Sequence, residues 1–186
     1  VYAHSDVRVS GNAVFSSNLT VVKSVGVASN LSVGGWIDLS GAFTVGSNVT
    51  VAGLTDLSGA VLARSDVRVL GNAVLSSNLT VAKSVGIASN LSVGGWLDLS
   101  GAVTVGSNVT VAGLTDLSGA VYAHSDVRVS GNAVFSSNLT VAKSVGIASN
   151  LSAGGWLDLS GAFTAGSNVT VAGFTDLSGA VLARSD

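Results

Sequence analysis

The chain has 186 residues with 24 glycines and no proline, cysteine or methionine, so disulfide bonds and thiolate chemistry are excluded. The net charge is −2 at pH 7 and charged residues make up only 10% of the sequence, so no basic surface for nucleic acid is expected. Polar residues or glycine interrupt every apolar stretch before it is long enough to cross a bilayer, which excludes a membrane-spanning helix and predicts no membrane insertion.

Three near copies of a 60-residue unit follow one another along the chain. They cover residues 1–60, 61–120 and 121–180, and residues 181–186 begin a fourth copy. The first and third copies differ at only six positions. Repetition of this kind indicates one continuous repeat domain over residues 1–186.

Within each unit the sequence repeats every six residues, and the chain divides into 31 hexads without remainder. In chain order the first ten are VYAHSD, VRVSGN, AVFSSN, LTVVKS, VGVASN, LSVGGW, IDLSGA, FTVGSN, VTVAGL and TDLSGA. The first and third places are apolar at 59 of 62 positions, and the exceptions are Thr55, Thr115 and Thr175. Apolar, polar, apolar alternation predicts a strand with two inward side chains. The small residues and Asn that follow predict a corner, because Gly and Asn tolerate positive φ.

Three hexads complete one turn of the predicted coil. Residues 25–42 match residues 43–60, which reveals a sub-repeat of three hexads. We therefore predict an all-β fold, a three-sided parallel β-solenoid with six-residue strands and about 18 residues per coil. Each 60-residue unit is three coils plus one hexad. Trp36, Trp96 and Trp156 are thus expected on three different faces.

The hexads resemble those of the hexapeptide-repeat family of left-handed parallel β-helices. The family pattern is an aliphatic residue, a small residue, two free places, a small or aliphatic residue and one more free place. VGSNVT from Val45 and VASNLS from Val27 fit it, and the similarity runs along the whole chain. The resemblance implies a left-handed coil. The chain differs from the family in its more consistently aliphatic first place and in lacking the loops of the family's acyltransferases.

The string SNLTVAKSVGIASNLSVGG, from Ser77, is also similar to the shafts of viral and phage tail fibres. Those shafts are often homotrimers with three chains interwound in one triple β-helix. In a single-chain column Asp38 stacks on Asp56, whereas in an interwound trimer Asp38 lies beside Thr44. The sub-repeat of three hexads favours the single chain, and the trimer remains the alternative.

No catalytic, cofactor or metal site is predicted, and we expect the protein not to be an enzyme. His4 and His124 could act as the base of a hexapeptide acyltransferase, but the equivalent positions hold Arg64 and Arg184, which favours solvated corner residues. The ten aspartates lack the dense Asp and Gly spacing of calcium-loaded β-rolls. They are interpreted as solvating charges that discourage lateral association.

Nine asparagines begin an Asn-X-Ser/Thr sequon and lie at the sixth place: Asn18, Asn30, Asn48, Asn78, Asn90, Asn108, Asn138, Asn150 and Asn168. Secretion by a eukaryotic host would make them glycosylation sites. The favoured and compatible interpretation is an asparagine ladder, since Asn12, Asn30 and Asn48 are each three hexads apart. The tryptophans at the same place are candidate lateral contacts, or they cover a corner of their own coil.

The sequence therefore favours a structural protein, the shaft of an extracellular, cell-surface or virion-surface fibre. Its expected partner is itself, through end-to-end or lateral assembly or a homotrimer, because the repeats end without a capping segment. The alternative is the stalk of an adhesin or receptor-binding fibre. An ice-binding protein is less favoured, because Arg8, Gly26 and Thr44 on one face form no threonine array.

Overall fold

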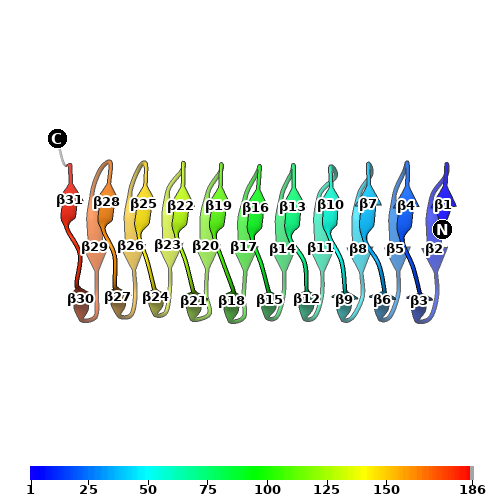
Figure 1. The fold of residues 1–186 in the computed structure, drawn as a ribbon, viewed down its shortest axis with the longest axis horizontal. Helices are drawn as coiled ribbons and strands as arrows, with labels where there is room; N and C mark the ends of the chain where they lie inside the picture. The colour runs from blue at the N-terminus through cyan, green and yellow to red at the C-terminus, as the bar shows by residue number, and fades with distance from the viewer. Residues whose placement is uncertain (185–186) are drawn as a thin grey trace.

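The computed structural model describes residues 1–184, which form 31 short strands wound into a three-sided column (Figure 1). Ser185 and Asp186, which end the predicted fourth copy, lie outside the described residues. Apart from β1, each strand has three residues and not the predicted six. The reason is that the last three residues of every hexad are needed to turn the chain onto the next face.

The strands form three parallel sheets, one on each side of the column. In axial order, sheet A contains β1 (Tyr2–Ala3), β4 (Leu19–Val21), β7 (Ile37–Leu39), β10 (Thr55–Leu57), β13 (Ala73–Leu75), β16 (Leu91–Val93), β19 (Val109–Val111), β22 (Val127–Val129), β25 (Val145–Ile147), β28 (Phe163–Ala165) and β31 (Val181–Ala183). Sheet B contains β2 (Val7–Val9), β5 (Val25–Val27), β8 (Phe43–Val45), β11 (Val61–Ala63), β14 (Leu79–Val81), β17 (Leu97–Leu99), β20 (Thr115–Leu117), β23 (Ala133–Phe135), β26 (Leu151–Ala153) and β29 (Val169–Val171). Sheet C contains β3 (Ala13–Phe15), β6 (Leu31–Val33), β9 (Val49–Val51), β12 (Val67–Val69), β15 (Val85–Ile87), β18 (Val103–Val105), β21 (Val121–Ala123), β24 (Leu139–Val141), β27 (Leu157–Leu159) and β30 (Thr175–Leu177).

Each strand pairs in parallel with the strand that begins three hexads later on the same face. Asp38 is paired with Asp56, as the single-chain column predicts, and not placed beside Thr44 as in the interwound trimer. The units begin with β1 in sheet A, β11 in sheet B and β21 in sheet C, so each starts one face further round. The predicted three-sided solenoid with three hexads per coil is confirmed.

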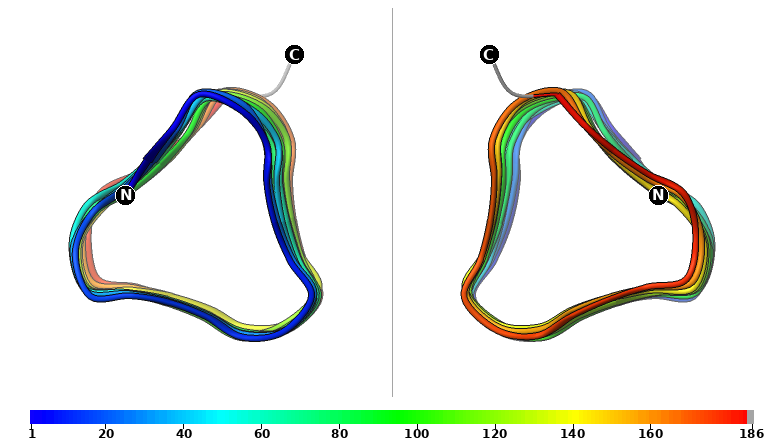
Figure 2. Two further views of the ribbon diagram at one scale, coloured as in Figure 1. Left: turned by 90° about the vertical axis from the view of Figure 1, so that its right-hand side faces the viewer. Right: turned by 90° about the vertical axis from the view of Figure 1, so that its left-hand side faces the viewer.

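The coil is right-handed. In the end-on view of Figure 2 from the N-terminal side, the chain runs clockwise round the triangle as it recedes from the viewer. The left-handed coil implied by the family resemblance is therefore wrong. Right-handed connections between parallel strands of one sheet are the general preference, because they suit the twist of the strands.

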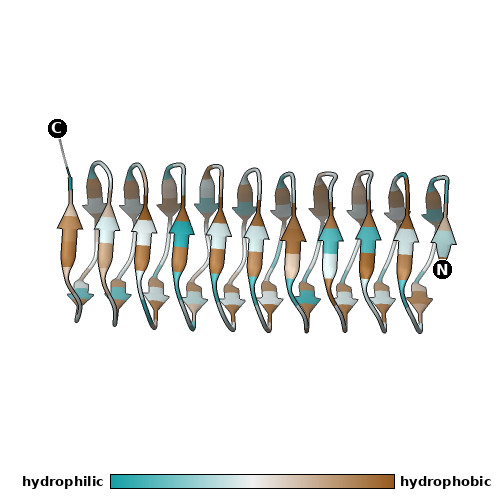
Figure 3. Ribbon diagram, turned by 45° about the horizontal axis from the view of Figure 1, so that its top comes forward, coloured by the Kyte–Doolittle hydropathy of each residue, from teal (hydrophilic) through white to brown (hydrophobic). Residues whose placement is uncertain are grey.

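The first and third places of the hexads point into the column and fill it with aliphatic side chains. Leu39, Val45 and Leu99 are completely buried, and the apolar core runs along most of the column. Figure 3 shows the corresponding apolar segments on the strands of successive coils. Thr55 and Thr115 occupy the same inward place, and both hydroxyl groups are buried without a hydrogen-bond partner.

The corners do not use the left-handed backbone conformation that the sequence suggested. No residue of the described range 1–184, glycine included, has a positive φ. Several corner glycines are instead required by the close approach of successive coils. A Cβ atom on Gly101 would lie 2.5 Å from the carbonyl carbon of Lys83 one coil below, and the Gly101 amide donates to that carbonyl oxygen.

Two glycine substitutions test whether the close approach of successive coils at the corner requires glycine, as distinct from a general effect of replacing glycine. Gly101→Ala forces adjacent coils apart, so we expect the free energy of unfolding to fall by about 1–3 kcal/mol. Gly86→Ala is the matched control, because a Cβ there meets no atom within 4 Å and alanine suits a strand better by about 0.5 kcal/mol. Urea denaturation followed by circular dichroism measures both, and equal midpoints would contradict the corner constraint.

Removing a buried hydroxyl should stabilise the column. Thr115 is 3% exposed, between Leu97 and Ala133 on the neighbouring strands. Thr115→Val keeps the branched shape and removes an unpaired polar group, so we expect stability to rise by about 1–2 kcal/mol. Thr104→Val changes an exposed position and should have little effect. Thermal denaturation compares the two variants, and a destabilised Thr115→Val protein would show that the hydroxyl has a partner in solution.

Candidate functional site

The outer surface repeats one arrangement three times, because each unit starts one face further round the column. Trp36 lies at the corner between β6 and β7, Trp96 between β16 and β17, and Trp156 between β26 and β27. These are the three different corners of the triangle. The candidate sites are consequently surface features that recur once per unit.

Asparagine and aspartate side chains join the corners of successive coils. Asn12 Oδ1 accepts from the amide of Asn30 at 3.2 Å, and Asn30 Oδ1 accepts from the amide of Asn48 at 3.1 Å. The series continues as Asn48 accepts from Asp66 at 3.3 Å and Asp66 from Ser84 at 3.0 Å. Sequence reasoning treated Asp66 as a solvating charge. Its spacing of three hexads from Asn48 was the signal that it belongs to the same ladder.

A second group of sequon asparagines supports the tryptophan corners. Asn18, Asn78 and Asn138 accept from the amides of Trp36, Trp96 and Trp156 at 3.1, 2.8 and 2.9 Å. The ladder bonds from backbone amides end on Oδ1 atoms, and the Nδ2 atoms of Asn30 and Asn90 also donate to Asn12 Oδ1 and Asn72 Oδ1 at 3.3 Å. Glycan attachment uses the Nδ2 atom and leaves it one hydrogen to donate. Of the nine sequon asparagines, Asn90 is half-buried and the others are exposed. Glycosylation stays a prediction that is chemically compatible with the ladder.

Loss of one ladder acceptor should cost a measurable amount of stability. Asn108 Oδ1 accepts from the amide of Asp126 at 3.2 Å. Asn108→Ala leaves that amide without this partner, so we expect the free energy of unfolding to fall by about 0.5–1.5 kcal/mol. Ser107→Ala, one residue earlier at the same corner, is the control. Chemical denaturation of both variants tests the ladder, and identical midpoints would show that Asn108 contributes nothing.

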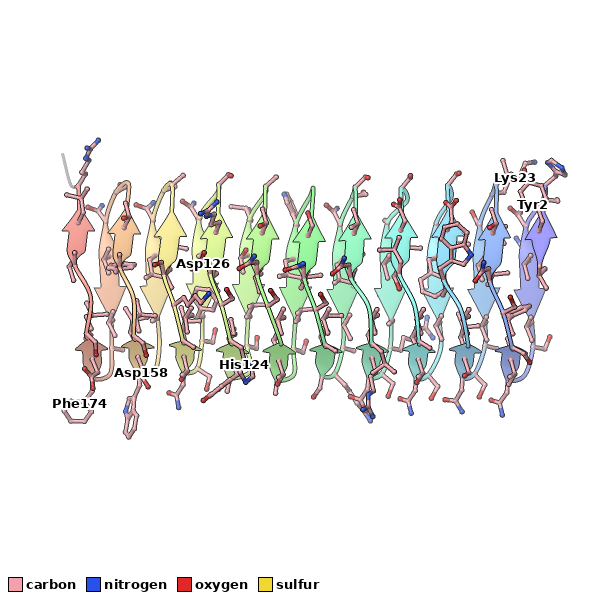
Figure 4. All side chains as sticks on the ribbon, viewed as in Figure 1. Tyr2, Lys23, His124, Asp126, Asp158 and Phe174 are labelled. Carbon is pink, nitrogen blue, oxygen red and sulfur yellow. The ribbon has the colours of Figure 1, made fainter. Side chains whose placement is uncertain are left out.

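The two histidines lie at different corners, each against the tyrosine of its own hexad. The ring centroids are 4.8 Å apart for Tyr2 and His4 and 5.2 Å apart for Tyr122 and His124. His124 Nδ1 lies 3.3 Å from the carbonyl oxygen of Val105, and Figure 4 shows His124 at the lower edge of the column. Within residues 1–184 no group of three or more His, Asp or Glu side chains could hold a metal ion.

Each tryptophan is followed one coil later by another large apolar side chain, and together the two form a ridge along the corner. The ridges are Trp36 with Leu54, Trp96 with Leu114, and Trp156 with Phe174. The tryptophans are 47%, 60% and 59% exposed, so they cover their own coil only in part. Trp156 and Phe174 meet edge to face at 6.0 Å, and Phe174 projects from the column (Figure 4).

An aspartate pair lies beside each ridge. Asp98 and Asp116 follow Trp96 and Leu114 by two residues, face outward, and are directly paired in sheet B. The same pairing joins Asp38 to Asp56 and Asp158 to Asp176. Like charges on adjacent strands disfavour the fold slightly. The pairs therefore concentrate negative charge on one flank of each ridge.

Hollows open in the surface at two of the glycines that occupy the outward place of a strand. Gly86 on β15 lies between Arg68 on β12 and Thr104 on β18, and the hollow there has a volume of about 420 Å³. The equivalent hollow at Gly146 has about 300 Å³ and is lined by Arg128 and Thr164. Sequence reasoning missed both. The signal was a glycine at a place that elsewhere carries a side chain.

Comparisons of the chain with protein-family models, with curated proteins and with solved structures returned no match. Within residues 1–184 there is no helix with the length and apolar character needed to cross a bilayer.

Proposed function

We propose that this chain is a structural protein that forms the shaft of an extracellular, cell-surface or virion-surface fibre. The observation that supports this most is the unbroken axial pairing of strands. Over residues 1–184 every strand pairs in register with a strand of an adjacent coil, and no inserted loop interrupts a face. A load along the column is then shared by backbone hydrogen bonds on all three sides.

The column is quasi-one-dimensional, so its length follows from the number of hexads alone. Each coil contacts only its neighbours and adds the same increment of core and hydrogen bonds. The corner ladders reinforce the same axis, since their hydrogen bonds also join one coil to the next. These properties suit a spacer that must be long, straight and stiff.

The outward faces do not favour an ice-binding function. That function needs a flat array of one residue type, whereas the outward positions of sheet B begin with Arg8, Gly26, Thr44, Leu62 and Thr80. The stalk of an adhesin would use the same column as a shaft. Its binding activity would reside in a different part of the molecule.

We also propose self-association along the axis, which the same geometry supports. The strands of the first and last described coils have backbone groups without a partner on one side, and such edges attract further strands. A second copy stacked in register on the last described coil would continue the three sheets, with one strand on each of β29, β30 and β31.

Electron microscopy and fibre diffraction of the purified chain test this proposal. We expect straight filaments built from rods of about 50 Å, with an axial reflection at about 4.8 Å from the strand spacing. Leu177→Lys places a charge in the interior of the last described coil and should block stacking. Asp176→Lys, which points outward from the same strand, is the control. Single rods at every concentration would contradict a self-assembling shaft.

A further inference from the structure

We propose that columns of this chain pack side by side and parallel, with the tryptophan ridge of one column seated in the glycine-floored hollow of the next. The partner is thus a second copy of the same chain. The proposal goes beyond the shaft function. It concerns contacts between the sides of neighbouring columns, which do not require the columns to stack end to end.

The ridge and the hollow of one unit lie on opposite sides of the column. Gly86 is in the middle of sheet C, whereas Trp96 is at the corner between sheets A and B, which is opposite sheet C. Little more than half a coil of chain separates the two, so they also lie at nearly the same height. A displacement without rotation, sideways and by about one coil along the axis, therefore brings the ridge of one column onto the hollow of its neighbour.

The shapes of the two surfaces are complementary. A Cβ atom on Gly86 would meet no atom within 4 Å, and the hollow around it holds about 420 Å³. Trp96 and Leu114 stand out from a narrow corner and are 60% and 42% exposed. Tryptophan supplies a large apolar area with few rotatable bonds, which is why it is favoured at the centre of interfaces.

The charges beside the ridge and the hollow have opposite signs. In two parallel columns related by such a displacement, the ridge's flank in sheet B faces the neighbour's corner between sheets B and C. That flank carries Asp98 and Asp116, and the neighbour's corner carries Lys83 with Arg68 on the adjoining face. An axial offset of about one coil, which centres the ridge on Gly86, also brings Asp98 level with Lys83. Two negative groups then face two positive groups, which fixes both orientation and register.

The other two units carry the same residues at the equivalent positions, apart from Phe174, and a hollow of about 300 Å³ is also present at Gly146. Each column therefore has three ridges, each with an outward glycine on the opposite side. Gly26 with Trp36, and Gly146 with Trp156, have the same separation along the chain and also lie on opposite sides. Each column can therefore contact neighbouring columns in three directions, at three different positions along its axis. Repeated contacts of this kind would build a bundle of parallel columns. One pair of columns of this length shares a single ridge in each direction, so the pair is weak and the bundle gains by multivalency.

Disulfide trapping tests the contact, because the chain has no cysteine of its own. A chain with Asp98→Cys is mixed with a chain with Lys83→Cys under mild oxidation, and covalent heterodimers are counted. We expect a yield several-fold above that of Asp98→Cys mixed with Thr110→Cys, an exposed position on sheet A that the packing leaves outside the contact. Equal yields from the two mixtures would overturn the proposal.

A second variant shows whether the hollow itself is responsible. Gly86→Leu in the Lys83→Cys chain adds a side chain to the hollow at a position where a Cβ meets no atom within 4 Å, and should reduce the heterodimer to the control level. Gly11→Leu, at another glycine with open space around it, should leave the yield unchanged, and a yield unaffected by Gly86→Leu would refute the ridge-in-hollow packing. All chains also carry Leu177→Lys to prevent axial stacking, so the result does not depend on whether the shaft proposal holds.

Discussion

The rest of the structure depends on one constraint, the return of the backbone to the same face after every third hexad in parallel register. Leu79 on β14 pairs with Leu97 on β17, and Leu97 in turn pairs with Thr115 on β20, with no residue gained or lost. A single inserted residue would turn inward side chains outward over the following strands. The constraint therefore places residues of the same hexad place in axial columns, and both core and surface are properties of those columns.

Each coil consists of three hexads, whereas the repeat unit consists of ten. This difference decides which residues become neighbours on adjacent coils. Hexads two, five and eight of a unit are stacked on one face, and all three end in Asn, so Asn12, Asn30 and Asn48 form a ladder. Hexads seven and ten are stacked as well, which brings Asp38 against Asp56. The same rule that creates a stabilising ladder thus also creates an unfavourable charge pair. Such a pair is compatible with a surface that interacts with an opposite charge.

The hexad pattern was sufficient to predict the architecture, the inward places and the spacing of the ladder, because these depend only on period and polarity. It did not predict handedness, since three hexads per coil describe either hand and the choice follows from strand twist. It misjudged the corners, where Gly101 is needed for space and not for a positive φ. It missed the hollow at Gly86 because a hollow is defined by its neighbours, Arg68 and Thr104, which lie one coil away on either side.

The 60-residue unit is not a whole number of 18-residue coils, and this has a direct consequence for the surface. A unit of nine hexads would equal three whole coils, and every tryptophan would lie above the last on one corner. Such a column could associate on one side only. The tenth hexad of the unit moves Trp36, Trp96 and Trp156 to three corners, each opposite a sheet that carries an outward glycine of the same unit. The tenth hexad leaves the core pattern unchanged but distributes the exposed tryptophans over three directions, so the proposed lateral packing extends in all three.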